Sequence, residues 1–118
     1  MNTFICYDRC GTCKKAEKWL GEHGIEFEKR PIKEDNPSAE ELKNWIEQSG
    51  IPARKFFNTS GQLYKSLGLK DKLGSMSDEE QTKLLATDGM LVKRPIFLTE
   101  DGKVLVGFKE QEWQDKLI

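Results

Sequence analysis

The 118-residue sequence contains no long apolar run and no recognisable targeting segment. A helix that crosses a bilayer needs about 20 consecutive apolar residues, and no stretch of this chain approaches that length. The first residues, Met1-Asn2-Thr3, do not begin a signal peptide. We therefore expect a cytoplasmic protein with no membrane partner.

The sequence also lacks an excess of charge of either sign. Its 19 basic residues nearly balance 20 acidic ones, which leaves a formal net charge of −1. Such a chain has no long-range attraction for the phosphate backbone of nucleic acids. We therefore expect no direct nucleic-acid partner.

Internal repeats, low-complexity segments and flexible linkers are absent as well. A chain of this length can bury a hydrophobic core without disulfide bonds to support it. We expect a single domain that spans residues 1–118.

Cysteine is scarce, with three residues that all lie among the first 13 positions. Thiols in the cytoplasm are kept reduced. A close pair of cysteines is therefore better explained by catalysis, redox sensing or metal binding than by a structural disulfide.

The apolar pattern of the first third of the chain predicts a strand, a helix and a second strand. A short aromatic and β-branched run predicts a strand over residues 4–7, and alternating apolar residues predict another over residues 25–32. Between them we expect a helix over residues 12–23 that ends at Gly24. This helix is expected to bury Ala16, Trp19, Leu20 and His23.

Residues 38–89, nearly half of the chain, are predicted to form a helical insertion. Two of its helices begin with the pattern of a capping box, in which a Ser caps the helix and a Glu three residues later bonds back. The pairs are Ser38 with Glu41 and Ser77 with Glu80.

The last quarter of the chain predicts a hairpin and a helix. Strands are expected over residues 96–98 and 104–106, joined by the turn signal Asp101-Gly102, with a helix over residues 110–117. The element order is then β-α-β, a helical insertion, and β-β-α, which gives one parallel and one antiparallel strand pair in a mixed central sheet. This order predicts an α/β protein with a thioredoxin-like fold.

The strongest chemical signal is the C-x-x-C run Cys10-Gly11-Thr12-Cys13, placed where the first strand gives way to the first helix. Unpaired N–H groups and the helix dipole at a helix start stabilise a thiolate, so we expect the pKa of Cys10 to be lowered. Cys13 is spaced to attack a mixed disulfide formed on Cys10. Gly11 and Thr12 are small enough to let a substrate approach. We predict an attacking thiol at Cys10 and a resolving thiol at Cys13.

Two other readings of the C-x-x-C run remain open. A zinc site needs two further ligands, and Cys6 and His23 are the candidates. Their placement, within a strand and a helix length away, argues against that site, and we predict no metal. The two thiols could instead be inert. Cys6 itself is best explained as a small apolar residue in a central strand.

A second landmark is the run Lys93-Arg94-Pro95. A proline that opens a strand after the insertion could be a cis proline facing the thiols, although cis is rare at any given X–Pro bond. Arg94 could pair with an oxyanion or with the Cys10 thiolate. The alternative is an ordinary solvated charge beside a strand.

With these parts in place, the sequence resembles the arsenate reductase/Spx family, the glutaredoxin-like branch of the thioredoxin superfamily, and within it the short, uncharacterised Gram-positive type. The resemblance covers essentially the whole chain. It rests on four stretches: residues 10–24, 57–61, 91–96 and 106–108. It implies that Pro95 is the cis proline of the family and that Arg94 is its active-site arginine.

The resemblance also marks a departure. Arsenate reductases of the family hold the oxyanion with three arginines, and Asn58 and Gly107 occupy the positions of two of them here. Each missing arginine removes charge-assisted hydrogen bonds of about 1.5–3 kcal/mol, which argues against efficient arsenate reduction. The residues implied to bind substrate are Gly11, Thr12, Asn58 and Pro95.

Three functions follow from these observations. The first is an arsenate reductase-like thiol–disulfide oxidoreductase with no bound cofactor. It would act on a small oxyanion or a mixed disulfide and be restored by thioredoxin, glutaredoxin or a low-molecular-weight thiol. The second, implied by the resemblance to Spx, is a redox-sensing transcriptional regulator that binds the C-terminal domain of the RNA polymerase α subunit. The third is an adaptor whose thiols are vestigial.

Overall fold

The computed structural model describes residues 1–118 as two compact units. One unit combines Met1–Pro31 with Arg94–Ile118, and the other is Ile32–Lys93. The chain enters the second unit after its second strand and returns to the first unit at Arg94. No helix is long and apolar enough to span a membrane.

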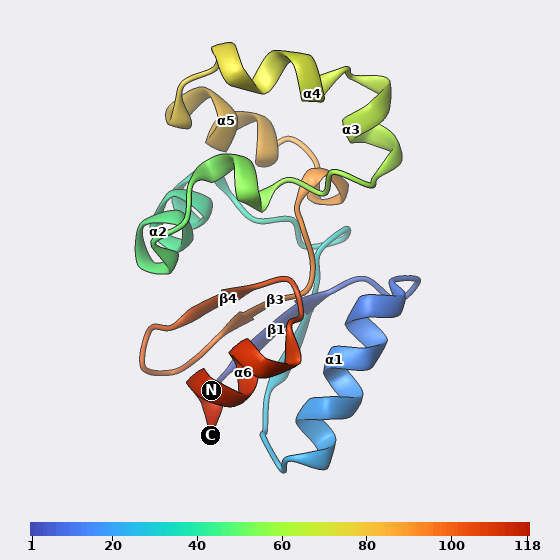
Figure 1. The fold of residues 1–118 in the computed structure, drawn as a ribbon, viewed down its shortest axis with the longest axis vertical. Helices are drawn as coiled ribbons and strands as arrows, with labels where there is room; N and C mark the ends of the chain where they lie inside the picture. The colour runs from blue at the N-terminus through green and yellow to red at the C-terminus, as the bar shows by residue number, and fades with distance from the viewer. The chain divides into compact units, whose positions relative to one another are not determined.

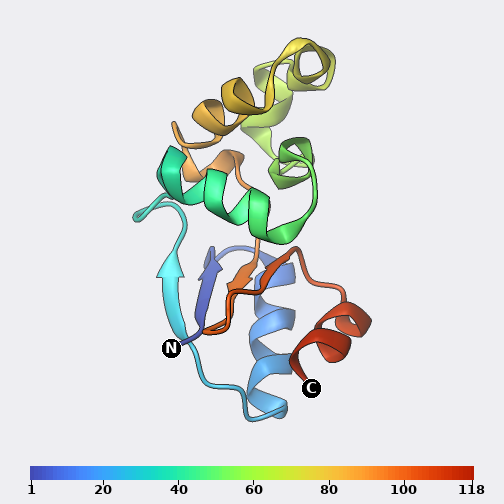
Figure 2. The same ribbon diagram turned by 90° about the vertical axis from the view of Figure 1, so that its left-hand side faces the viewer.

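The first unit is a four-stranded mixed sheet with two helices (Figures 1 and 2). Its elements are β1 Thr3–Cys6, α1 Gly11–Glu22, β2 Glu28–Pro31, β3 Ile96–Leu98, β4 Val104–Val106 and α6 Glu110–Leu117. The strand order is β2-β1-β3-β4. Strand β1 runs parallel to β2 and antiparallel to β3, and β3 and β4 form the hairpin. The predicted α/β class, element order and mixed sheet are confirmed.

Aromatic side chains fill the core of this unit. Phe97 and Trp113 are fully buried with ring centroids 5.4 Å apart, and Trp19 meets Trp113 edge-on at 6.1 Å. The predicted buried face of α1 is confirmed for Ala16, Trp19 and Leu20. The prediction was wrong for His23, which is exposed and stacks on Trp19 at 4.1 Å. His23 follows the last turn of the helix, where it covers the outer face of the indole.

Strand β2 is shorter than predicted, because residues 25–27 return the chain from the helix to the sheet. The helix ends before Gly24 as predicted, and Gly24 is left-handed with φ 66°. The N–H of Ile25 donates back to the carbonyl oxygen of Leu20 at 3.0 Å. The ladder then begins at Glu28, whose N–H donates to the Asn2 carbonyl oxygen at 2.8 Å. The alternating pattern therefore extends beyond the paired residues.

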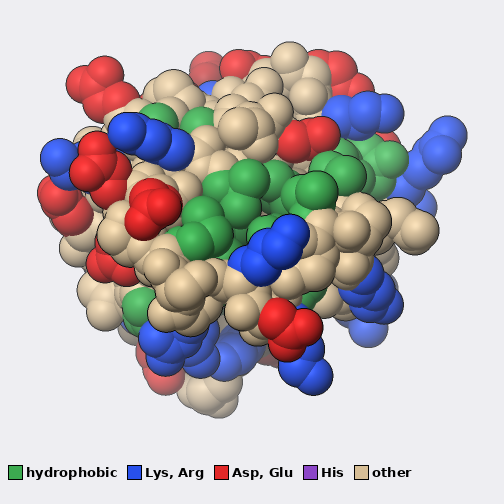
Figure 3. All heavy atoms as spheres, turned by 90° about the horizontal axis from the view of Figure 1, so that it is seen from above, with side chains coloured by type: hydrophobic (Ala, Val, Ile, Leu, Met, Phe, Trp, Pro, Cys, Tyr) green, Lys and Arg blue, Asp and Glu red, His purple; other side chains and the backbone are tan.

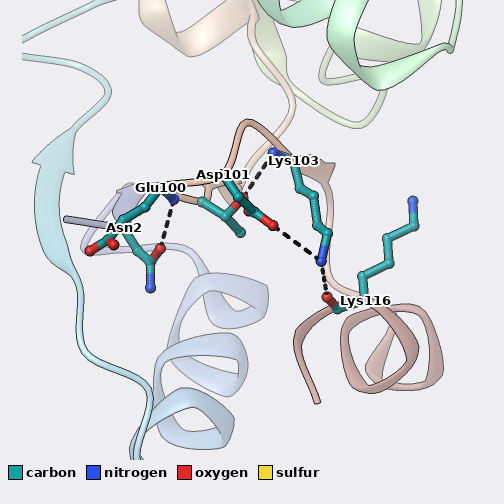
Figure 4. A network of polar contacts seen from close by, with 6 residues as sticks. Asn2, Glu100, Asp101, Lys103 and Lys116 are labelled. Carbon is teal, nitrogen blue, oxygen red and sulfur yellow. Dashed lines mark hydrogen bonds and ion pairs between the residues drawn. The ribbon is translucent and has the colours of Figure 1, made fainter.

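The β3–β4 turn is tied to both ends of the chain (Figure 4). The predicted hairpin turn is confirmed, with Gly102 at φ 92°. The N–H of Glu100 donates to Asn2 Oδ1 at 3.0 Å. Lys103 Nζ donates to the Lys116 carbonyl oxygen at 2.9 Å and pairs with Asp101 at 3.5 Å. These contacts hold the hairpin against β1 and the end of α6.

The second unit consists of short helices (Figure 1). They are α2 Ala39–Ser49, the 3₁₀ turn η1 Ala53–Phe56, α3 Gln62–Ser66, α4 Leu69–Lys72, η2 Leu73–Ser75, α5 Asp78–Leu85 and η3 Gly89–Leu91. Both predicted capping boxes are confirmed: Ser38 caps α2 and Ser77 caps α5, each with its Glu bonding back. The helices α4 and η2 were not predicted, because segments of three or four residues carry no measurable helical period.

Backbone contacts join the last residues of this unit to earlier ones. An isolated bridge joins Phe57 to Val92, and the N–H of Lys93 donates to the Phe56 carbonyl oxygen at 2.7 Å. Gly89 lies so close to Ile32 that a Cβ would overlap the Ile32 carbonyl oxygen. The start and the end of this unit therefore lie side by side.

Candidate active site

Cys10 is the N-cap residue of α1 and is partly buried. A turn after β1 delivers it there, because the N–H of Cys10 donates to the Tyr7 carbonyl oxygen at 3.0 Å. The Cys10 sulfur accepts a hydrogen bond from the backbone N–H of Cys13 at 3.4 Å. The thiol therefore occupies the place that Ser, Thr or Asp takes in an ordinary N-cap, facing the unpaired N–H groups of the first turn.

The surroundings of Cys10 favour its ionised form. Partial burial opposes ionisation, but hydrogen bonds from Cys13 and the charge and hydrogen bonding of the Arg94 guanidinium outweigh it, so the pKa of Cys10 is lowered. The predicted direction is confirmed.

Cys13 has the opposite environment, with only 3% of its surface exposed. Burial raises its pKa to about 12; a backbone hydrogen bond from Tyr7 acts against that rise, and the neighbouring Cys10 sulfur adds to it. Two titratable groups whose pKa values are pushed apart are typical of a site with two distinct chemical roles. Here the surroundings favour ionisation of the Cys10 thiol and oppose ionisation of the Cys13 thiol.

Arg94 and Pro95 join the two thiols in the same unit. The Arg94–Pro95 peptide bond is cis, as the family resemblance implied. The Arg94 guanidinium lies over the Tyr7 ring, with Cζ 5.0 Å from the ring centroid. Its Nε and Nη1 atoms are buried and have no hydrogen-bond partner. The guanidinium is therefore not an ordinary solvated surface charge.

The two residues between the thiols, Gly11 and Thr12, are exposed in the first turn of α1. A Cβ on Gly11 would meet no atom within 4 Å. Packing against other parts of the protein therefore does not demand glycine at this position.

The remaining predicted substrate residue, Asn58, belongs to the Ile32–Lys93 unit. Its Oδ1 accepts a hydrogen bond from Ser60 Oγ at 3.2 Å, and its N–H donates to the Leu91 carbonyl oxygen at 2.8 Å. These contacts hold the loop before α3. Asn58 is placed within its own unit only, so it is not among the residues that the structure brings together around Cys10.

Gly107 is the other residue that the family resemblance matches to an arginine. It is buried and has φ 72°, a left-handed conformation that favours glycine. Its N–H donates to the Pro95 carbonyl oxygen at 2.8 Å, and its own carbonyl oxygen accepts from Trp113 Nε1 at 3.0 Å. The backbone at this position supports Pro95, and no second cation stands beside Arg94 from here.

Cys6 is 6% exposed at the end of β1, and burial raises the pKa of its thiol. This placement agrees with the expected small apolar residue. No three His, Cys, Asp or Glu side chains gather in a way that could hold a metal ion.

Sequence reasoning missed Tyr7, which it treated only as the end of a strand. The structure places its ring under Arg94 and its backbone against both thiols. The signal available in the sequence was an aromatic residue three positions before the attacking cysteine, at the point where strand gives way to loop.

Comparison with known proteins agrees with this geometry. The ArsC family model matches residues 6–116. The chain is 57% identical to the uncharacterised protein YusI of Bacillus subtilis, covering 96% of this chain and 95% of that protein. It is 27% identical to the global transcriptional regulator Spx 2 of Bacillus cereus, covering 87% of this chain and 76% of the regulator.

Solved structures give the same result. An ArsC-related protein from Bacteroides fragilis superimposes with a TM-score of 0.93 and 56% identity, covering 97% of this chain and 95% of the other. A possible arsenate reductase from Streptococcus mutans gives a TM-score of 0.87 and 43% identity, covering 97% and 98%. These relatives confirm the thioredoxin-like fold. The chain belongs to the ArsC family.

Proposed function

We propose that this protein is a thiol–disulfide oxidoreductase in which Cys10 attacks the substrate and Cys13 resolves the product. The observation that carries the proposal is the contrast between the two thiols. Cys10 is partly exposed at a helix N-cap with a lowered pKa, whereas Cys13 is buried with a pKa raised to about 12. A nucleophile must be accessible and ionised, and a resolving thiol must stay protonated until it is needed.

The first step is attack of the Cys10 thiolate on one sulfur of a substrate disulfide. A bond forms between Cys10 Sγ and that sulfur, the substrate disulfide breaks, and the released thiolate takes a proton from water. Arg94 supports this step, because its guanidinium stabilises negative charge on the attacking and departing sulfur atoms.

The second step forms the internal disulfide. Once Cys10 is in a mixed disulfide, its negative charge no longer opposes ionisation of Cys13, although burial still does. The Cys13 sulfur attacks Cys10 Sγ, and its proton passes to the second departing thiolate. The substrate has gained two electrons and the protein holds a Cys10–Cys13 disulfide. An external thiol, such as thioredoxin, glutaredoxin or a low-molecular-weight thiol, reduces the protein again; no bound cofactor is required.

For the substrate, we favour a mixed disulfide over arsenate. Arg94 is the arginine that acts on Cys10 in this unit. Gly107 stands where the family resemblance implies a second arginine, so the charge available to hold an arsenate ion is smaller. Gly11 and Thr12 would line the approach to Cys10, together with Pro95 of the same unit. Relatives named arsenate reductase support reductase chemistry without fixing the substrate.

A second candidate function is a redox-sensing transcriptional regulator that binds the RNA polymerase α C-terminal domain. The relationship to a protein named as a global transcriptional regulator favours it. Figure 3 shows apolar side chains gathered on one face of the molecule among charged ones, a surface that suits a protein partner. In this case the same two thiols would report oxidation by forming their disulfide.

Two assays on one preparation separate these functions. The first measures NADPH consumption coupled through thioredoxin or glutaredoxin, with arsenate and with a glutathione mixed disulfide as substrates. The second measures capture of the polymerase α C-terminal domain by the reduced and by the oxidised protein. Turnover with the mixed disulfide and no capture is expected. Capture that is lost on oxidation, without turnover, would select the regulator. If neither turnover nor capture is observed, the adaptor remains.

A Cys6→Ala variant is the matched control for both assays. Cys6 is buried outside the C-x-x-C run, so its loss is expected to leave turnover intact.

A further inference from the structure

Tyr7 contacts each group of the candidate site through a different part of its structure. Its carbonyl oxygen accepts from the Cys10 N–H at 3.0 Å, and its own backbone N–H donates to the Cys13 sulfur. Its ring lies under the Arg94 guanidinium, at 5.0 Å from Cζ to the ring centroid. Backbone contacts survive any substitution, so the ring contact with Arg94 is the part that depends on the side chain being tyrosine.

Two contacts orient the head of the Arg94 side chain, namely the Tyr7 ring and a hydrogen bond to the Cys10 sulfur. Its Nε and Nη1 atoms are buried without a hydrogen-bond partner. A guanidinium on a long side chain keeps one position only when its face or its donors are engaged, and an aromatic face is a favourable surface for it. Tyr7 supplies that face within the same unit.

We propose that Tyr7 is a positioning residue whose ring holds the Arg94 guanidinium beside the Cys10 sulfur. This inference rests on the proposed function, since it concerns the reactivity of Cys10 as the attacking thiol. Tyr7 acts through Arg94 and does not contact the substrate. When the ring is lost, Arg94 moves among several positions, and the Cys10 thiolate loses part of its stabilisation.

The contact uses the face of the ring and not the hydroxyl group. Tyr7→Phe keeps the face and is therefore the matched control, whereas Tyr7→Leu keeps an apolar side chain but removes the aromatic ring. The charged and titratable groups that act on the Cys10 sulfur are Arg94 and the Cys13 thiol. The Cys6 thiol also lies close, and Asp8 acts on Cys6. Both substitutions keep all of these residues and both remove the Tyr7 hydroxyl, so the two variants differ only in whether the aromatic ring is present.

The test measures the rate of alkylation of Cys10 by iodoacetamide as a function of pH, with the modified residue identified by peptide mass spectrometry. The buried Cys6 and Cys13 react slowly and serve as internal references. In the unaltered protein and in Tyr7→Phe, the midpoint of the profile is expected below the usual value of about 8.5. In Tyr7→Leu it is expected to move up toward that value, with a several-fold lower rate at neutral pH.

A double-mutant cycle with Arg94→Gln completes the test. Because the ring acts through Arg94, Tyr7→Leu is expected to change nothing further once Arg94 is absent. A midpoint in Tyr7→Leu equal to that of the unaltered protein would overturn the inference and leave the proposed function standing. So would an equal shift with and without Arg94. A midpoint near 8.5 in the unaltered protein would count against the proposed function itself. Circular dichroism checks folding, and Tyr7→Met replaces Tyr7→Leu if the latter does not fold.

Discussion

At the scale of single residues, two thiols three positions apart in the chain differ in almost every physical respect. Cys10 lies at the N-terminus of α1, where its sulfur accepts a hydrogen bond from the Cys13 N–H and interacts with Arg94. Cys13 points into the core from the first turn of the same helix. The rise of one turn is therefore enough to move a sulfur atom from a site that stabilises negative charge to one that opposes it.

Replacing Cys10 by serine is expected to abolish turnover while leaving the fold intact. Serine is among the favoured N-cap residues, so the cap hydrogen bond is kept and the free energy of unfolding should be unchanged or higher by up to about 1 kcal/mol. The coupled NADPH assay and urea unfolding of the same preparation check both parts. Residual turnover above that of a reaction without protein would contradict the assignment of Cys10.

The raised pKa of Cys13 also predicts how stability depends on pH. In the unfolded chain this thiol ionises near 8.5, whereas in the folded protein it stays protonated up to about 12. Between these values the unfolded state releases a proton that the folded state keeps, so the free energy of unfolding falls as the pH rises. Cys6 contributes in the same direction and Cys10 in the opposite one.

Cys13→Ser isolates this contribution. Between about pH 8 and pH 10, the variant is expected to lose less unfolding free energy than the unaltered protein, whatever its absolute stability, because serine does not ionise there. Urea unfolding at the two pH values measures the difference. An equal or steeper loss in the variant would show that Cys13 is not protected from ionisation.

How far residue-level prediction succeeds depends on whether the cause is local. The position of Cys10 at a helix start predicts its lowered pKa, because the backbone N–H of Cys13 one turn along contributes to it. The raised pKa of Cys13 was not predicted, because it comes mainly from burial in the folded protein. The cis bond before Pro95 needed the family resemblance, because X–Pro bonds alone favour trans. The Tyr7–Arg94 contact joins residues 87 positions apart, from 7 to 94, and no local pattern encodes it.

At the scale of elements, two glycines differ in whether the structure leaves room for a side chain. Gly21 lies in α1, and a Cβ there would meet nothing within 4 Å. Gly89 opens η3, where a Cβ would overlap the Ile32 carbonyl oxygen. The same substitution should therefore have opposite effects at the two positions.

Gly21→Ala is expected to stabilise the protein by up to about 0.5–1 kcal/mol, because alanine restricts the unfolded chain and favours helix. Gly89→Ala should destabilise it by about 1–3 kcal/mol, since the backbone must move to admit the methyl group. Urea unfolding of the two variants side by side gives both values. A neutral Gly89→Ala would mean that η3 is not held against Ile32 as described.

Element prediction succeeds where several signals agree. Ser38 and Ser77 each combine a cap, a returning Glu and a following apolar stripe, and both helices begin where expected. The second strand was predicted too long, because Ile25 and Phe27 are partly buried without being paired. Alternation reports burial, and only a partner strand decides pairing.

At the scale of the whole molecule, residues 32–93 form a compact unit that interrupts the sequence of the sheet unit. The predicted insertion at residues 38–89 lies within it. We infer that the two units nevertheless fold together as one domain, because the sheet unit is itself built from both ends of the chain. The parallel pair and the antiparallel hairpin could be predicted from the element sequence, whereas the pairing of β1 with β3 and the extent of each unit depend on contacts between distant parts of the chain.

A Trp45→Phe variant tests this inference. Its remaining tryptophans, Trp19 and Trp113, both report on the sheet unit, whereas far-UV circular dichroism also reports the helices of the other unit. One domain predicts coincident urea transitions by the two probes. Two separate midpoints on the same variant would show that the units unfold independently.

The central claim is that Cys10 attacks and Cys13 resolves. Intact mass spectrometry after exposure to oxidised glutathione tests it most directly. The reduced protein should end with a Cys10–Cys13 disulfide and no adduct, Cys13→Ser should carry one glutathione on Cys10, and Cys10→Ser should carry none. A stable glutathione adduct on the unaltered protein, or an adduct on Cys13 in Cys10→Ser, would contradict the account.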